Sequence, residues 1–391
     1  MPTFPHIPAA RRPSRSARAG VVDVVVIGGG VVGAAAAWQL AGRGREVVQL
    51  EQFEAGRARG FPYGSAELYR PSYSAAPYVR LAMEALPLWR EVEAQTGAAL
   101  LQITGGVDHG DPRRTSALAG SLGEHGIAHE WLDADEASHR WPGMVFSGPV
   151  LHQPDRSGRL HADHAVAALT AAAVAHGAVV HRSTPATAIA VRGDDLVEVE
   201  TPRGPVRACR AVVAVGARTA DLLDGLVELP RLRVTQEQPA TFPLQGGVAP
   251  FSPHHVAWPT FVHHTGPEHG WPSSVHGTST ADGRVKLGFH GVGTQTHPHR
   301  HAFAPEPVQL RRLQEYVTAF LPGLDHRLPT PIGCTRTSTS DGRFLLDTAG
   351  PLVVGAGFSG YGLAFAPALG RVLADLATGV IDRAPAAAAG R

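Results

Sequence analysis

Three glycines near the N-terminus limit the fold of this chain more than any other feature. Gly28, Gly30 and Gly33 follow the apolar run Val21–Ile27, which predicts a buried strand, and precede an Ala-rich stretch that predicts a helix. In such a G-x-G-x-x-G pattern the first glycine permits a tight turn, the second lets the backbone approach a pyrophosphate, and the third lets helix and strand pack closely. Glu51 ends the next apolar strand, where an acidic side chain accepts hydrogen bonds from ribose hydroxyls. The pattern predicts a Rossmann-type unit that binds a dinucleotide.

The nature of that dinucleotide depends on segments farther along the chain. The start of the predicted helix, at Val31 and Val32, supplies free N–H groups and a positive dipole end for a diphosphate, but it does not separate FAD from NAD. An apolar strand ending at Gly216, and a C-terminal strand followed by a glycine-rich turn and a long helix, favour FAD, because such elements bring a helix N-terminus toward the flavin. We therefore expect further FAD contacts at Gly216, Gly357, Ser359, Gly360 and Gly362.

Composition excludes several classes of function. A net charge of +1 argues against a nucleic acid or an anionic membrane as a partner recognised by bulk charge. The chain has no uninterrupted apolar run of about 18 residues, so we expect no membrane span. Two cysteines in 391 residues exclude a disulfide framework and indicate a reducing compartment, which we expect to be the cytoplasm. Residues 1–20 and 385–391 carry no targeting pattern and are expected to be a disordered leader and tail.

The 21 histidines raise the alternative of a metal site. Pairs occur at 254–255 and 263–264, and a denser run occurs at 296–301. None of these histidine groups has a cysteine or aspartate at ligand spacing, and the surrounding sequence is rich in Pro and Gly. We therefore expect no metal.

Lysine is nearly absent from the chain. Of the 35 basic residues only Lys286 is a lysine, and 45 glycines and 32 prolines indicate a coding bias that replaces lysine with arginine. A retained lysine suggests a role that a guanidinium cannot fill, although a chance survivor would look the same.

Seven segments match one family in order along the chain. They are GGGVVGAAAAWQL (28–40), ADEASHRWPG (134–143), QPDRSGRLHADHAVAAL (153–169), AVVAVGA (211–217), VKLGFHG (285–291), IGCTRTSTSDGRFLLD (332–347) and GAGFSGYG (355–362). With them the chain resembles the monomeric sarcosine oxidase and N-methyltryptophan oxidase branch of the D-amino-acid-oxidase-like flavoproteins. The resemblance implies an α/β (α+β) fold with a glutathione-reductase-like FAD-binding Rossmann-type domain and a mostly antiparallel β-sheet substrate domain. We expect the FAD-binding domain to comprise residues 21–85, 150–225 and 330–384, and the substrate domain residues 86–149 and 226–329.

The resemblance also implies an activity and residue roles. It implies an FAD-dependent oxidase that converts the C–N bond of a secondary or cyclic amine, or of an amino-acid-like substrate, to an imine and reduces O2 to hydrogen peroxide. Lys286 matches the lysine over the flavin that promotes the reaction with oxygen, because a fixed positive charge stabilises the charge that develops on O2. His290 matches a position beside the substrate, with a core or surface histidine as the alternative. Cys334 matches the cysteine that attaches FAD covalently, with a buried structural thiol as the alternative, a role that Cys209 fits.

Three departures from the family pattern bear on the substrate. Arg70 matches the second of two arginines near the flavin, but Glu67 replaces the first. Tyr361 replaces a histidine, and Ala364 replaces a lysine that helps to hold the substrate carboxylate. Arg70 alone can still bind a carboxylate, and Glu67 either pairs with Arg70 or attracts an amine. These changes disfavour sarcosine and favour a bulkier or carboxylate-free amine, such as a natural-product intermediate.

Two other classes of function stay open. One is a flavin dehydrogenase or desaturase that acts on a C–C bond or a carrier-bound substrate, and the other is a non-catalytic flavin-binding scaffold. Residues 248–280 resemble the family least and are expected to set specificity. We expect a monomer or weak homodimer whose partners are a small amine and O2.

Overall fold

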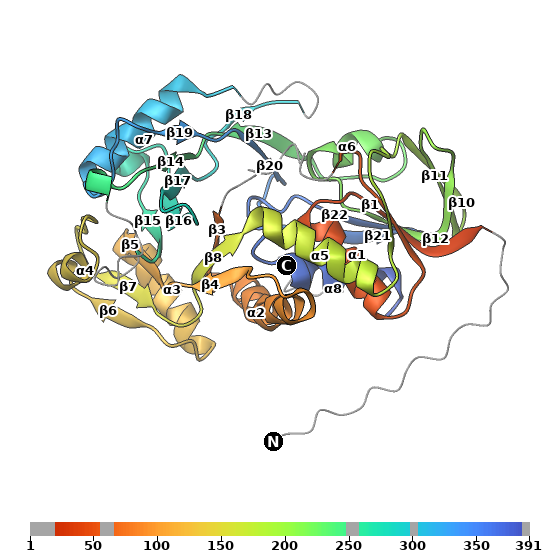
Figure 1. Cartoon of the computed structure of the whole chain (residues 1–391), viewed down its shortest axis with the longest axis horizontal. Helices are drawn as coiled ribbons and strands as arrows, with labels where there is room; N and C mark the ends of the chain where they lie inside the picture. Colours follow the sequence, from red (N-terminus) through yellow and green to blue (C-terminus); the bar gives the residue numbers. More distant parts are fainter. Residues whose placement is uncertain (1–19, 55–65, 248–257, 298–303, 385–391) are drawn as a thin grey trace, which may run out of the picture.

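The computed structural model describes residues 20–54, 66–247, 258–297 and 304–384. The expected leader and tail, the histidine pair at 254–255 and most of the 296–301 run lie outside these ranges. Two eight-stranded sheets form the two halves of the described chain (Figure 1). No helix within the described ranges is both long and apolar enough to cross a membrane.

The first sheet, which we call the nucleotide sheet, has the strand order β10-β11-β12-β1-β2-β9. Strand β12 pairs with β11 along its first half and with β22 along its second half, and β22 pairs in turn with β21. Five strands run parallel: β1 (Val21–Ile27), β2 (Val47–Leu50), β9 (Val179–His181), β12 (Val206–Val213) and β22 (Leu352–Ala356). The antiparallel strands are β10 (Ala188–Gly193), β11 (Leu196–Glu200) and β21 (Leu345–Ala349). The predictions of strands at the first glycine pattern, before Gly216 and near the C-terminus are confirmed.

Both faces of the nucleotide sheet are buried along the second half of β1, which explains its apolar run Val24–Ile27. Val24 and Val26 pack in one apolar cluster with helices α1 (Val31–Gly42), α2 (Ala76–Thr96), α5 (Ala162–Ala175) and α8 (Ala366–Ala377). Val25 and Ile27, which alternate with them, pack in another cluster with β11 and with the segment after α6 (Thr219–Leu222). Helix α1 lies between α5 and α8 on its face of the sheet (Figure 1).

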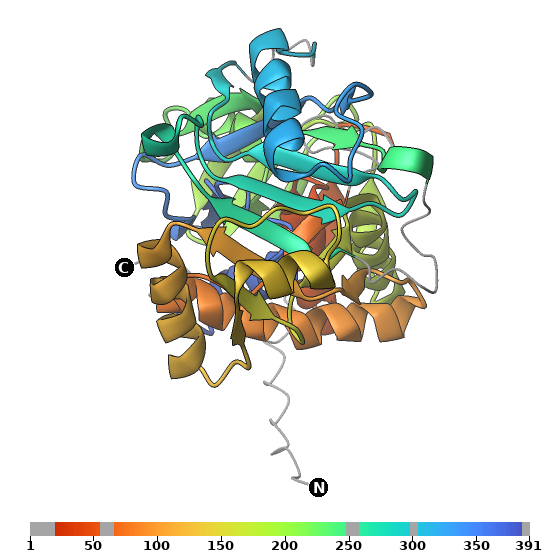
Figure 2. The same ribbon diagram turned by 90° about the vertical axis from the view of Figure 1, so that its left-hand side faces the viewer.

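The second sheet, which we call the substrate sheet, has the order β19-β14-β17-β16-β15-β5-β7-β6. Its strands are β5 (Gly106–Gly110), β6 (Glu130–Leu132), β7 (Val150–Gln153), β14 (Ala240–Phe242), β15 (Thr260–His264), β16 (Val275–Ser279), β17 (Val285–Phe289) and β19 (Thr330–Pro331). All neighbours are antiparallel except β5 and β15. Helices α7 (Pro307–Phe320) and α4 (Ala134–Arg140) bury their apolar sides on this sheet, and Figure 2 shows α7 across the strands.

Two three-stranded sheets join these halves. One consists of β3 (Ala66–Tyr69), β8 (Gly158–His161) and β4 (Leu101–Ile103), and the other of β18 (Thr294–Gln295), β13 (Arg233–Glu237) and β20 (Cys334–Ser338). The remaining elements are helix α3 (Pro112–Glu124) and the 3-10 turns η1 (Gly216–Arg218), η2 (Gln245–Gly247) and η3 (Pro267–His269).

Two of the expected domain boundaries do not coincide with breaks in these structures. The boundary at residue 85 falls inside α2, which packs on α5 and α8 and so continues the core of the nucleotide sheet. The boundary at residue 150 assigns β7 to the FAD-binding part, whereas β7 pairs with β5 and β6 in the substrate sheet.

Candidate functional site

The carboxyl ends of three parallel strands meet around the first glycine pattern. The N–H of Gly28 donates to Leu50 O (2.9 Å), and Ala214 N–H donates to Ile27 O (2.9 Å). A β-carbon on Gly28 would lie 2.4 Å from Ala214 O, and one on Gly33 would lie 2.0 Å from Gly28 O. The roles expected for both glycines in the turn and in helix packing therefore follow from direct backbone contact.

Space beyond this turn fits a dinucleotide. A β-carbon on Gly30 would meet nothing within 4 Å, and no side chain caps α1, whose first residues are Val31 and Val32. The first N–H groups of a helix have no partner within it and favour an anion. Glu51 accepts hydrogen bonds from Gly29 N–H (2.7 Å) and Phe53 N–H (2.8 Å) beside this space, which leaves part of its acceptor capacity for ribose hydroxyls. Gly29, which the sequence analysis passed over, has no room for a β-carbon against Glu51.

The glycine pair at 30 and 33 gives a matched prediction. Gly33→Ala is expected to lower protein stability by about 1–3 kcal/mol, because its β-carbon overlaps Gly28 O. Gly30→Ala has room in the protein alone and an ordinary φ of −68°, so its stability is expected to stay within about 0.5 kcal/mol of the parent while its flavin content falls. Thermal unfolding and flavin absorbance per protein measure the two effects. A Gly30→Ala protein with full flavin content would contradict the placement of the diphosphate.

The other predicted cofactor residues lie at the same edge of the nucleotide sheet. Gly216 begins η1 directly after β12, and η1 contacts β20. The turn after β22 contains Gly357, Ser359, Gly360 and Gly362, and Ser359 N–H donates to Thr337 O of β20 (3.0 Å). Strand β20 therefore connects the dinucleotide end of the site to the cavity described next.

A cavity of about 310 Å³ lies where β3, β17, β20 and the turn after β22 converge. The predicted residues that line it are Glu67, Arg70, Lys286, His290, Cys334, Gly360 and Tyr361. The structure thus brings together side chains from four separate parts of the sequence.

Lys286 and Glu67 form an ion pair in this cavity. Lys286 lies on β17 with only 4% of its surface exposed, and Glu67 lies on β3. The interpretation that Glu67 pairs with Arg70 is wrong, because the carboxylate reaches the ammonium of Lys286 instead. The pair therefore places an ammonium and a carboxylate side by side where water has little access.

Arg70 has a different acidic partner, Asp108 on β5. Arg70 Nη1 lies 2.6 Å from Asp108 Oδ1, and His264 Nε2 lies 2.7 Å from the same oxygen. Burial alone would raise the pKa of the Asp108 carboxyl, but the charge of Arg70 and the hydrogen bond with His264 outweigh it and lower that pKa. The charge of Arg70 is therefore already compensated by the protein.

His290 lies between two polar side chains of the cavity. Arg336 Nη2 donates to His290 Nε2 (3.2 Å), and the hydroxyl of Tyr361 lies 3.4 Å from the same nitrogen. Burial, followed by the charges of Arg336 and Arg70, lowers the pKa of His290 to about 4. Because an arginine only donates, Nε2 acts as acceptor and the neutral ring carries its proton on Nδ1.

The two cysteines differ in position. Cys334 begins β20 and lines the cavity, and burial raises the pKa of its thiol to about 12 against the opposing charge of Lys286. It is therefore a protonated thiol at neutral pH in the protein alone. Cys209 lies within β12, as expected, but it is partly exposed rather than buried.

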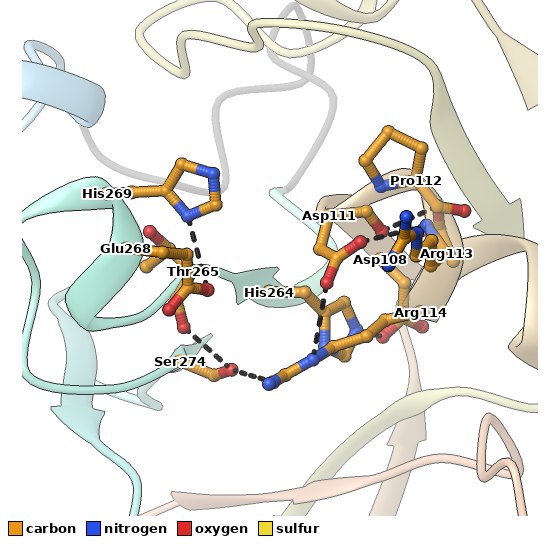
Figure 3. A network of polar contacts seen from close by, with 11 residues as sticks. Asp108, Asp111, Pro112, Arg113, Arg114, His264, Thr265, Glu268, His269 and Ser274 are labelled. Carbon is orange, nitrogen blue, oxygen red and sulfur yellow. Dashed lines mark hydrogen bonds and ion pairs between the residues drawn. The ribbon is translucent and has the colours of Figure 1, made fainter.

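One wall of the cavity is a polar network that Figure 3 shows from close by. Arg114 of α3 extends from Asp111 (Nε to Oδ2, 3.5 Å) to Ser274 (Nη1 to Oγ, 3.3 Å). Arg114, Val262, His264, Ser274 and His276 all line the cavity. Part of the segment 248–280, in which we expected substrate specificity, thus borders the cavity, while residues 248–257 lie outside the described ranges.

The histidine pair at 263–264 has two separate roles. His263 stacks on His109 with ring centroids 4.2 Å apart and approaches Tyr316 Oη (3.0 Å), while His264 contacts Asp108. Within the described ranges no group of three or more His, Cys, Asp or Glu side chains is arranged to hold a metal ion.

Three histidines whose pKa values are lowered by partial or full burial predict how stability depends on pH. Burial lowers the pKa of His263 and His290 to about 4 and that of His276 to about 3. The unfolded chain takes up these protons below pH about 6.5, whereas the folded protein does not until its own pKa values are reached. The free energy of unfolding is expected to fall between pH about 6.5 and 4.5, by about 1.4 kcal/mol per pH unit for each such histidine at most. Denaturant unfolding measures this, and stability that stays level across that window would contradict it.

Sequence reasoning missed several residues of the cavity. Arg336 lies two positions after Cys334, so strand alternation, had it been applied to this segment, would have placed both on one face. Asp108 is a lone acid within a buried strand, which is itself a signal of a charged partner. His276 and Glu237 also line the cavity, and nothing in their local sequence marks them.

Known proteins resemble this chain over nearly its whole length. The profile of the family described as "FAD dependent oxidoreductase" matches residues 23–376. Monomeric sarcosine oxidase of Bacillus sp. (strain NS-129) is 29% identical over 91% of this chain and 92% of its own. N-methyl-L-tryptophan oxidase of Yersinia pestis is 27% identical over 90% and 94%. The crystal structure of NikD, described as an unusual amino acid oxidase essential for nikkomycin biosynthesis, superposes with a TM-score of 0.81 at 28% identity over 93% of this chain and 95% of that one. These matches confirm the resemblance and the fold class.

Proposed function

Because the chain belongs to the family of FAD-dependent oxidoreductases, we propose that it oxidises the C–N bond of a secondary or cyclic amine or of an amino-acid-like substrate. When bound, FAD would supply the redox chemistry: the amine would lose a hydride equivalent and a proton to become an imine, and O2 would take up two electrons and two protons to leave as hydrogen peroxide. Sarcosine itself is disfavoured by the changes at residues 67, 361 and 364, and we infer a natural-product intermediate instead.

The observation that carries this proposal is the cavity that joins Lys286 and Cys334. A buried ammonium, a thiol, a neutral imidazole and a phenol meet at the start of β20, and the end of the same strand contacts the turn after β22. The residues around α1 would hold the diphosphate of FAD, and Cys334 on β20 would lie at the cavity in which the flavin supplies its redox chemistry. The relatives whose names describe amine or amino acid oxidation support the reaction class.

Each side chain has a role in this proposal. Lys286 stabilises the negative charge that develops on O2 as it accepts an electron. The neutral His290 and the hydroxyl of Tyr361 orient the substrate, since the imidazole carries no charge that would oppose a cationic amine. Glu67 holds the ammonium of Lys286 in place. Gly28, Gly30, Val31, Val32, Gly33 and Glu51 hold the dinucleotide end.

We further propose that Cys334 carries FAD through a thioether bond from Sγ to the 8α carbon. The thiol of Cys334 and the 8α methyl group of the flavin would each lose one hydrogen, and O2 would accept the two protons and two electrons as hydrogen peroxide. The position of Cys334 on the cavity wall supports this attachment.

A panel of amines tests the proposed reaction. The purified yellow protein is mixed with N-methyl amino acids, cyclic imino acids and alkyl amines, and oxygen uptake and peroxide are measured together. We expect at least one amine to give peroxide in equal amount to the oxygen consumed. Turnover only with an artificial electron acceptor would favour the dehydrogenase or desaturase alternative, and a flavin that no amine reduces would favour the non-catalytic scaffold.

A further inference from the structure

We propose that the substrate carries a carboxylate and that Arg336 of β20 is the residue that binds it. This inference rests on the proposed function, because it names the chemical class of the amine. It concerns a specificity-determining side chain rather than the oxidation itself.

The charges of the cavity point to Arg336. Four cationic side chains line it, and three have an acidic partner: Arg70 pairs with Asp108, Lys286 with Glu67, and Arg114 with Asp111. Among the residues that the structure describes, Arg336 forms no ion pair. An uncompensated guanidinium in a largely buried cavity favours an anionic ligand.

The carboxylate of Glu237 lines the same cavity but is engaged elsewhere. Its Oε1 accepts from Thr235 Oγ1 (2.6 Å), and its Oε2 accepts from the N–H of Gly293 (3.1 Å). Glu237 lies opposite Cys334 in the pairing of β13 with β20, whereas Thr235 lies opposite Arg336. Both carboxylate oxygens thus accept hydrogen bonds from β13 and from the residue before β18 rather than from the guanidinium.

The guanidinium of Arg336 uses one N–H group to contact His290 and has further N–H groups available to a ligand. Nη2 donates to His290 Nε2 (3.2 Å), while Nε is buried and has no hydrogen-bond partner in the described structure. A buried N–H without a partner is unfavourable, and a ligand oxygen that accepts from it removes that penalty. Because a guanidinium presents five N–H groups in a planar fork, it can bind a carboxylate through two of them and keep its contact with His290.

Two glycines border this side chain. A β-carbon on Gly291 would overlap Arg336 Nη1 at 2.2 Å, whereas one on Gly360 would lie 3.7 Å from Nε, in ordinary contact. Both glycines also line the cavity and have positive φ values (+70° and +88°). The absence of a side chain at Gly291 therefore leaves room for the guanidinium in its present position. The absence of a lysine at Ala364 then does not indicate a substrate without a carboxylate, because β20 supplies a cation to the same cavity.

An isosteric pair of unreactive probes tests the proposal in the holoenzyme. Benzoate and benzamide have nearly the same shape and differ in charge, and their binding is followed through the absorbance spectrum of the oxidised flavin without turnover. We expect the parent protein to bind benzoate at least about tenfold more tightly than benzamide. We expect Arg336→Met to weaken benzoate binding about 10- to 100-fold, the loss typical of a hydrogen bond to a charged group, and to leave benzamide within about twofold.

Arg114→Met is the matched control, since it removes another guanidinium from the cavity wall, one that is paired with Asp111. It is expected to keep the preference for benzoate. Arg336→Gln, which can still donate to His290, is expected to lose the preference as Arg336→Met does.

Three results would overturn the proposal. The parent protein could bind benzoate and benzamide equally or bind neither, or an Arg336 variant could keep the preference for benzoate. Loss of flavin from both Arg336 variants would also overturn it, because that result would place Arg336 at the cofactor.

A parent protein that oxidises amines without a carboxylate as efficiently as amines with one would overturn this inference and leave the proposed function intact.

Discussion

Replacing Lys286 with methionine is expected to slow the reaction of the reduced holoenzyme with oxygen by about 100- to 1,000-fold, the range found when one preorganised charge-stabilising group is removed. Lys286 is only 4% exposed, so little water can reach the site to replace its charge near O2. Reduction by the amine under anaerobic conditions is expected to change less than tenfold. Stopped-flow mixing of the prereduced protein with oxygenated buffer measures the first rate, and anaerobic mixing with amine measures the second.

The partner of Lys286 provides the control for this experiment. Lys286→Met leaves Glu67 without its cation, so a slow variant could reflect a displaced carboxylate rather than a lost charge. Glu67→Gln alone is expected to react with oxygen at least as fast as the parent, and the double variant is expected to be as slow as Lys286→Met. Recovery of the parent rate in the double variant, or an undiminished rate in Lys286→Met, would contradict the oxidase role of this lysine.

Replacing Cys334 with serine is expected to convert covalently attached flavin to a fully dissociable one. The parent protein should keep its yellow colour in the pellet after acid precipitation, whereas the variant should release it to the supernatant, because the hydroxyl cannot form the thioether. Cys209→Ser is the matched control and should behave as the parent, since Cys209 lies in β12 away from the cavity lining. Colour released from the parent protein would refute the attachment.

The nucleotide sheet was predictable because its signals are local. The glycines at 28, 30 and 33 lie within one short stretch between an apolar strand and an Ala-rich helix. Gly28 and Gly33 are each explained by a close backbone contact, and Gly30 borders open space. The same holds for the strand before Gly216 and for β22 with α8. Short-range patterns such as these require no knowledge of long-range packing.

The partners within the cavity were not predictable because they depend on packing between distant segments. Glu67 and Lys286 are 219 residues apart in the sequence, and they meet because β3 contacts β16, the neighbour of β17. The sequence left open whether Glu67 pairs with Arg70 or attracts an amine, and neither alternative named Lys286. Arg70 lines the same cavity but pairs with Asp108 of β5, which lies 38 residues away in the sequence. The parallel pair of β5 and β15 inside an otherwise antiparallel sheet also brings Asp108 to His264, which no local pattern indicates.

The central claim is that this chain uses FAD to oxidise an amine and returns the electrons to oxygen. Anaerobic titration of the yellow holoenzyme with the amine panel, followed by admission of air, tests it most directly. We predict that at least one carboxylate-bearing secondary or cyclic amine bleaches the flavin absorbance completely without oxygen, and that air restores the colour within seconds with one peroxide formed per flavin. A flavin that no amine bleaches, or that stays bleached in air, would contradict the account.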